Sequence, residues 1–85
     1  MNDKTFDIVN KHVSIWNILN LPEEIAIYEY TDFVPLIIEF LNGNTESLIE
    51  INSYISDLIG IGFENSNVLN DFNILLQSIR NELII

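Results

Sequence analysis

The chain of 85 residues contains no cysteine, and no long uncharged apolar run. Without cysteine it can form neither a disulfide framework nor a thiolate metal site, and nothing points to an oxidising compartment. No uncharged apolar run approaches the roughly 18 residues that cross a bilayer, and residues 1–12 lack the continuous apolar segment of a signal peptide. The composition therefore predicts a soluble, cytoplasmic protein that does not insert into a membrane.

Basic residues are scarce. Three Lys and Arg residues stand against 13 Asp and Glu residues, which gives a formal net charge of −10, and no Lys or Arg occurs between His12 and Arg80. A surface of one sign costs stability through self-repulsion, but it attracts a basic partner from a distance. Nucleic acids and anionic membranes are poor partners for it. The charge balance favours a basic protein as the partner, and an acidic surface that only maintains solubility is the alternative.

Motifs for catalysis are also missing from the sequence. The single histidine, His12, lies among apolar neighbours without a cysteine or a well-spaced carboxylate, so we expect a partly exposed helix residue rather than a general base. Gly60 and Gly62 match neither a phosphate loop nor a dinucleotide fingerprint, because no Lys-Ser/Thr pair or third glycine follows. We predict that the protein is not an enzyme and has no cofactor or metal.

Helical periodicity runs through the whole chain. A hydrophobic content of 48% in 85 residues suits one small domain, residues 1–85, and the apolar residues recur at spacings of three and four. Proline and glycine supply the stop signals between segments. We predict an all-α fold, a small antiparallel bundle of four main helices. The expected helical segments are 3–20, a short turn at 22–28, two helices within 31–60, and a last helix capped within 65–67.

The segment 31–60 reads as a helical hairpin around which the chain is organised. Apolar residues cover so much of its first helix that this helix should be deeply buried, with Phe40 in the core. Three residues are left for solvent: Asp32, Pro35 and Glu39. Asp32 is the expected N-cap of the first helix, and Asn44 or Thr45 that of the second. The segment 25–30 also alternates partly like a strand, but a helical turn is favoured because no other segment could pair with a strand.

The second helix of the hairpin has two distinct faces. Its apolar stripe consists of Leu48, Ile51, Ile55, Leu58 and Ile59. Glu46, Glu50 and Asp57 gather on the opposite side, although carboxylates one turn apart repel by roughly 0.2–0.5 kcal/mol on an isolated helix. Tyr54 lies between the two faces, where it could anchor a protein interface or, equally, pack on a neighbouring helix. The candidate partner-binding residues are Asp32, Glu39, Glu46, Glu50, Tyr54 and Asp57.

The segment 36–48, LIIEFLNGNTESL, is a helix that ends in Phe-Leu-Asn-Gly and is followed by a polar-capped helix. It resembles the helical hairpin of the colicin-D-type immunity proteins, and the resemblance covers about residues 33–60. Those proteins are small acidic four-helix bundles whose negative surface covers the basic active site of a nuclease toxin. The resemblance implies an immunity or antitoxin role, including immunity against contact-dependent growth inhibition toxins, with a basic nuclease domain as partner.

Two other functions remain open. Glu46-Ser47-Leu48 resembles the Asp-Ser-Leu attachment site of acyl carrier proteins, which implies phosphopantetheine on Ser47, although residues 42–45 differ from the Leu-Gly-x-Asp that precedes that site. A DNA mimic that blocks a nucleic-acid-binding protein would use the same acidic surface as an immunity protein. Only the identity of the partner separates these last two.

Overall fold

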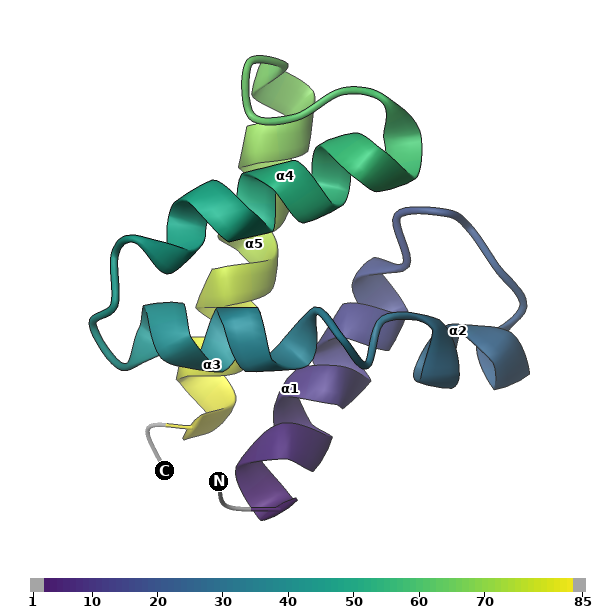
Figure 1. Ribbon diagram of the computed structural model, residues 1–85. Coiled ribbons are helices and arrows are strands. Elements are labelled where there is room, and N and C mark those ends of the chain that lie inside the picture. Colours follow the sequence, from purple (N-terminus) through teal and green to yellow (C-terminus); the bar gives the residue numbers. More distant parts are fainter. Residues whose placement is uncertain (1–2, 84–85) are drawn as a thin grey trace.

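The computed structural model describes residues 3–83, in which all regular secondary structure is α-helical (Figure 1). The predicted all-α class is therefore confirmed, including the helical assignment of the segment that alternates like a strand. The described helices are α1 (Asp3–Trp16), α2 (Glu23–Glu29), α3 (Val34–Leu41), α4 (Ser47–Ile59) and α5 (Ser66–Leu83).

The helices form two crossed layers. α3 and α4 lie side by side in opposite directions, and in Figure 1 they cross in front of α1 and α5, which also run in opposite directions. α1 is central, since it packs against α2, α3 and α5. The Cα atoms extend over 33 × 31 × 19 Å, as expected for two layers whose helix axes lie roughly 8–10 Å apart.

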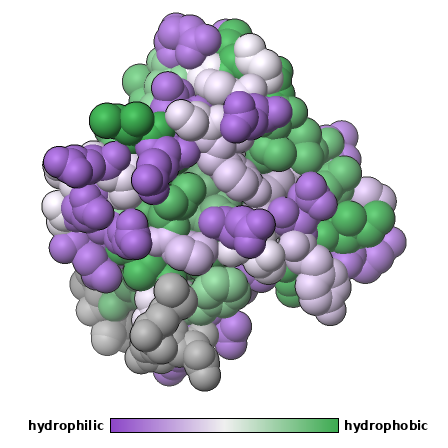
Figure 2. All heavy atoms as spheres, in the orientation of Figure 1, coloured by the Kyte–Doolittle hydropathy of each residue, from purple (hydrophilic) through white to green (hydrophobic). Residues whose placement is uncertain are grey.

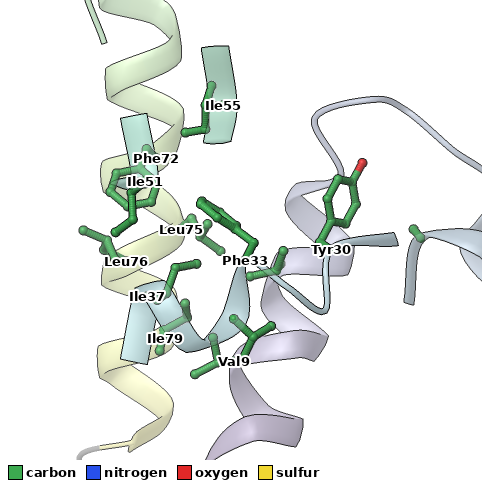
Figure 3. Packing of buried hydrophobic residues seen from close by; sticks show 13 residues of the cluster. Val9, Tyr30, Phe33, Ile37, Ile51, Ile55, Phe72, Leu75, Leu76 and Ile79 are labelled. Atoms are coloured by element: carbon green, nitrogen blue, oxygen red, sulfur yellow. The ribbon is translucent and has the colours of Figure 1, made fainter. Parts of the chain in front are cut away.

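Phe33 lies at the centre of the core, where the two layers cross (Figure 3). Trp16 of α1 stacks on its ring with centroids 5.5 Å apart, and Tyr54 of α4 stacks on it at 4.5 Å. Phe72 of α5 contacts the same ring in a tilted arrangement at 6.4 Å. One buried ring thus contacts three helices. The fully buried apolar residues are Val9, Val13, Ala26, Tyr30, Phe33, Val34, Ile37, Ile51, Ile55, Phe72, Leu75, Leu76 and Ile79.

α1 ends at Trp16, earlier than the predicted end at residue 20, because the following loop is held by an asparagine. Asn17 and Asn20 have φ values of 41° and 54°, a left-handed conformation that asparagine tolerates better than most residues. The Asn17 side chain accepts from the Leu21 N–H (3.0 Å) and donates to the Leu21 carbonyl (2.7 Å). It also accepts from the hydroxyl of the buried Tyr30 (2.8 Å). These bonds compete with the helical ladder. The sequence also predicts Asp3 as the cap or a first-turn acid of α1, but the Asp3 side chain lies outside the described part.

The predicted N-cap of α3 is wrong. Phe33 precedes the first helical residue, its φ and ψ of −78° and −28° are already helical, and no side chain caps the helix. The reason is a turn that leads directly into α3, in which the Phe33 N–H donates to the Tyr30 carbonyl (2.9 Å). Asp32 is exposed within this turn. Pro35 stands at the second helical position, where its missing N–H has no intrahelical partner.

The start of α4 also differs from the prediction. Glu46 occupies the N-cap position, and neither Asn44 nor Thr45 makes a side-chain cap. The backbone N–H groups of residues 47–49 instead donate to carbonyls three residues earlier, at 3.1 to 3.2 Å. The turn therefore winds directly into α4, so that its first N–H groups are satisfied without a side-chain oxygen.

The other stop signals act as predicted. Gly43 and Gly60 have φ values of 101° and 77°, left-handed conformations that end α3 and α4 and that glycine adopts without a steric penalty. Asn65 caps α5, because its side-chain oxygen accepts from the N–H groups of Asn67 (2.9 Å) and Val68 (3.2 Å). The chain between α4 and α5 folds back onto the core, where the ring of residue 63 lies 5.1 Å from that of Phe72.

Two apolar positions of the hairpin are less buried than their spacing predicts. Phe40 is only partly buried, and Leu48 is 37% exposed. Ser47 points inward instead; it is 2% exposed and its hydroxyl donates to the Asn44 carbonyl (2.6 Å). The reason is the crossing of the layers: the turn end of the hairpin projects beyond the helices that would cover it (Figure 1).

We expect Phe33→Ala to reduce the free energy of unfolding by roughly 3–5 kcal/mol, because it leaves a cavity where three helices meet. Such a loss is a large part of the total stability of a small domain. Denaturant titration followed by circular dichroism measures it. Phe40→Ala is the matched control and should cost clearly less, since Phe40 is only partly buried. Equal losses of unfolding free energy in the two variants would show that the ring stack on Phe33 stabilises the fold no more than the partly buried Phe40 does.

Candidate functional site

The outward face of α4 carries the acidic stripe that the sequence predicts. Glu46, Glu50 and Asp57 are all exposed, and Ser53 between them is exposed too. Within residues 3–83, none of these three carboxylates makes an ion pair. Their mutual repulsion is therefore balanced only by water and dissolved ions.

An exposed apolar residue lies beside this stripe. Ile49 is 72% exposed, and at about 100° per residue it falls next to Glu46 and Ser53 on the helix surface. The apolar stripe did not include it, and helical spacing alone gives no reason for an isoleucine among acids. Apolar side chains ringed by charges are typical of protein interfaces. Ile49 therefore joins the candidate site, although sequence analysis did not identify this residue.

Tyr54 connects α4 to the acids that precede α3. Its ring stacks on Phe33 and is partly buried. The ring therefore packs inside the molecule, which is one of the two predictions made for Tyr54. Burial raises the pKa of Tyr54, and the negative charges of Asp32 and Glu29 raise it further. The phenol therefore lies within electrostatic reach of both carboxylates. Glu29, the last residue of α2, was not among the candidates, because nothing in its local spacing relates it to α4.

The acidic candidates belong to one layer of the molecule. Glu39 is exposed on α3, and the antiparallel pairing of α3 with α4 places it toward the turn end, as Glu46 and Glu50 are. Asp32 lies at the other end, beside Tyr54. Figure 2 shows hydrophilic residues gathered over the edge of the molecule where the α3–α4 turn lies, with apolar residues between them. The structure thus places the six candidates on the α3–α4 hairpin and the turn before it.

The bases lie in the opposite layer. Lys4, Lys11 and His12 are on α1, and Arg80 is in the last turns of α5. Because α3 and α4 contain no Lys or Arg, the acidic layer has no cation of its own. The bases thus lie in a different layer from the acids of the hairpin, although the α1–α5 layer also contains Asp7, Asp71 and Glu82.

His12 lies beside an ion pair that joins α1 to α5. Glu82 of α5 accepts from the Lys11 ammonium (2.8 and 2.9 Å) and lies 2.8 Å from His12 Nε2. The His12 side chain is 17% exposed. Hydrogen bonds from Lys11 and then from His12 hold the pKa of Glu82 below its usual value. Glu82 lies 70 residues from His12 in the sequence, so local spacing could not reveal this partner.

Two features are absent from residues 3–83, a cluster of metal ligands and a membrane-spanning helix. Among residues 3–83, no three His, Cys, Asp or Glu residues come together in a way that could hold a metal ion. No helix in this part of the chain is both long and apolar enough to cross a membrane.

Comparison of the chain with models of protein families, with curated proteins and with solved structures gives no match.

Moderate salt should stabilise the free protein. Screening at physiological ionic strength shortens the range of repulsion to about 8 Å, which relieves the acids of the α3–α4 layer. We expect the melting temperature to rise between low and moderate NaCl. The rise should be smaller for Glu46→Gln/Glu50→Gln/Asp57→Asn, which removes three of the repelling charges. A melting temperature that stays flat or falls would contradict a strained acidic surface.

The ion pair between α1 and α5 predicts a pH dependence. Because the folded-state pKa of Glu82 is lowered from its ordinary 4.5, the pair contributes stability above that ordinary value and loses it as the pH falls through the lowered pKa. Wild type should therefore exceed Glu82→Gln in stability near neutral pH, and the difference should vanish in acid. Urea titrations near neutral pH and in acid measure this difference in stability. A Glu82→Gln difference that persists in acid would exclude this origin.

Proposed function

We propose that the protein is an immunity protein, or antitoxin, that binds a basic toxin domain and covers its active site with the acidic face of the α3–α4 layer. The observation that carries the proposal is the exposure of Glu46, Glu50 and Asp57 on one face of α4 in a layer without any Lys or Arg. Such a face is less stable alone than one with mixed charges, and a basic partner would relieve the repulsion.

Each candidate residue has a part in this proposal. Glu46, Glu50 and Asp57 steer and contact the partner, while Asp32 and Glu39 extend the acidic surface toward the two ends of α3. Tyr54 is partly buried against Phe33, and the exposed part of its side chain would contact the partner. Ile49, which is 72% exposed, supplies the apolar contact that acids alone lack, since well-packed apolar residues carry much of the affinity of protein interfaces.

The proposed partner is a nuclease domain. A nuclease binds the phosphate backbone through basic residues, so an acidic helical layer would compete for its substrate groove. In this proposal α1, α3, α4 and α5 are the four main helices of a small antiparallel bundle, and α2 connects two of them. The protein then acts by occlusion in the cytoplasm and needs neither catalysis nor a cofactor.

The acyl-carrier alternative is weakened by the position of Ser47. A carrier serine must be accessible to the enzyme that attaches phosphopantetheine, whereas Ser47 is 2% exposed and its hydroxyl donates to the Asn44 carbonyl. A DNA mimic remains the second candidate, because it would use the same carboxylates. The two differ in the partner, a toxin domain or a nucleic-acid-binding protein of the cell.

Reversing the α4 acids tests the proposal. Glu46→Lys/Glu50→Lys/Asp57→Lys should leave the helical circular dichroism unchanged, because these side chains point away from the buried Ile51 and Ile55. The toxin encoded by the neighbouring reading frame should bind it much more weakly. Each reversal replaces attraction by repulsion, and where a contact is desolvated the loss is on the order of 2–5 kcal/mol. Affinity measured at two salt concentrations and protection of cells that co-express the toxin provide the readouts.

The matched control changes the same number of charges elsewhere. Asp7→Lys/Glu23→Lys/Glu24→Lys also converts three exposed acids to bases, so both variants have the same net charge. It should keep most of the affinity, losing only the long-range attraction that salt screens. Full protection of cells by the α4 variant, or an equal loss of affinity in the two variants, would contradict binding through the α4 face.

A further inference from the structure

The turn between α3 and α4 contains the only asparagine of the chain that precedes a glycine, Asn42 before Gly43. Both residues are exposed, and Figure 1 shows this turn at the edge of the molecule. A Cβ atom added at Gly43 would have nothing within 4 Å beyond its neighbours in the chain. The fold therefore leaves open space around the backbone of this dipeptide.

Such a dipeptide can react with itself. The backbone nitrogen of Gly43 attacks Cγ of Asn42, the bond from Cγ to Nδ2 breaks, and the nitrogen leaves as ammonia with the proton of the Gly43 N–H. The product is a five-membered succinimide ring. Water then adds to either ring carbonyl and opens the ring, which gives aspartate or isoaspartate. Glycine favours the first step, because no Cβ hinders its nitrogen and its backbone rotates freely.

The structure separates Asn42 from the other asparagines among residues 3–83, because its side chain makes no hydrogen bond in this part of the chain. Five asparagine side chains are held by hydrogen bonds: Asn10, Asn17, Asn52, Asn65 and Asn81. Three more asparagines lie within α5, whose hydrogen bonds hold the N–H of the following residue: Asn67, Asn70 and Asn73.

Two asparagines remain for comparison, Asn20 and Asn44. The nitrogen that would attack Asn20 belongs to Leu21, and its N–H already donates to Asn17 Oδ1 (3.0 Å). Asn44 is exposed in the same turn as Asn42, but the β-branched Thr45 follows it and restricts the approach of the nitrogen. Asn44 is therefore a matched control within the chain.

The reaction requires the turn to open locally. Asn42 has a ψ of 5°, which must rotate before the Gly43 nitrogen can reach Cγ. The hydrogen bonds that oppose this rotation are those from the Gly43 N–H to the Phe40 carbonyl (3.1 Å) and from the Asn44 N–H to the Glu39 carbonyl (3.0 Å). Both lie at an exposed helix end, where opening does not require global unfolding.

We propose that Asn42 is a deamidation site that converts to aspartate or isoaspartate in the folded protein. The conversion adds one negative charge to a chain whose formal net charge is −10. The new carboxylate lies at the C-terminal end of α3, where the helix dipole disfavours a negative charge, and between Glu39 and Glu46 in the sequence. The reaction thus strengthens the acidity of the α3–α4 layer while it weakens the turn that connects its helices.

The test is to incubate the intact protein in mildly alkaline buffer and to map its peptides by mass spectrometry with fragmentation that identifies isoaspartate. Residue 42 should convert at least about tenfold faster than Asn44, which corresponds to a barrier lower by about 1.4 kcal/mol. Asn42→Gln should abolish the fast conversion, and Asn44→Gln should leave it unchanged. No conversion at residue 42, or equal rates at Asn42 and Asn44, would overturn the proposal.

A core variant tests whether the folded protein reacts. Ile79→Val removes one methyl group from a fully buried side chain of α5, which should raise the unfolded fraction by roughly two- to tenfold. The rate at residue 42 should stay the same if only the turn opens. A rate that rises in proportion to the unfolded fraction would exclude reaction in the folded state. Neither experiment involves a toxin, so the outcome is independent of the proposed function.

Discussion

The stack of rings on Phe33 is the contact on which the arrangement of the helices depends. Trp16 and Tyr54 stack on it from α1 and α4, and Phe72 contacts it from α5. Because an 85-residue chain buries only a small core, one point that connects both layers contributes a large share of the tertiary packing. The same stack fixes the rotation of α4 about its axis. With Tyr54 held on Phe33, and with Ile51 and Ile55 buried, the acidic stripe has to face outward.

The charges of the two layers follow from this division. In the α1–α5 layer, Glu82 is neutralised by Lys11 and lies within hydrogen-bond distance of His12, so it joins α5 to α1. The α3–α4 layer has no comparable cation, so its carboxylates repel one another with only water and salt between them. The acidic face is thus a constraint on stability that the core has to outweigh. Mixed charges would also provide solubility and would avoid this cost, and the proposed basic partner would relieve the repulsion.

The sequence predicts the local features of this molecule and misses those that depend on the crossing of the layers. Periodicity indicates the helices and the acidic face of α4, and the ends at Gly43 and Gly60 follow from left-handed glycine conformations. The partner of His12 could not be predicted, because Glu82 comes close only when α1 and α5 pack together. The early end of α1 depends on side-chain bonds of Asn17, and the exposure of Phe40 depends on where the hairpin projects beyond the other layer. The partner of His12 and the exposure of Phe40 are tertiary effects that override local spacing, whereas the end of α1 combines local bonds from Asn17 to Leu21 with a longer-range bond to Tyr30.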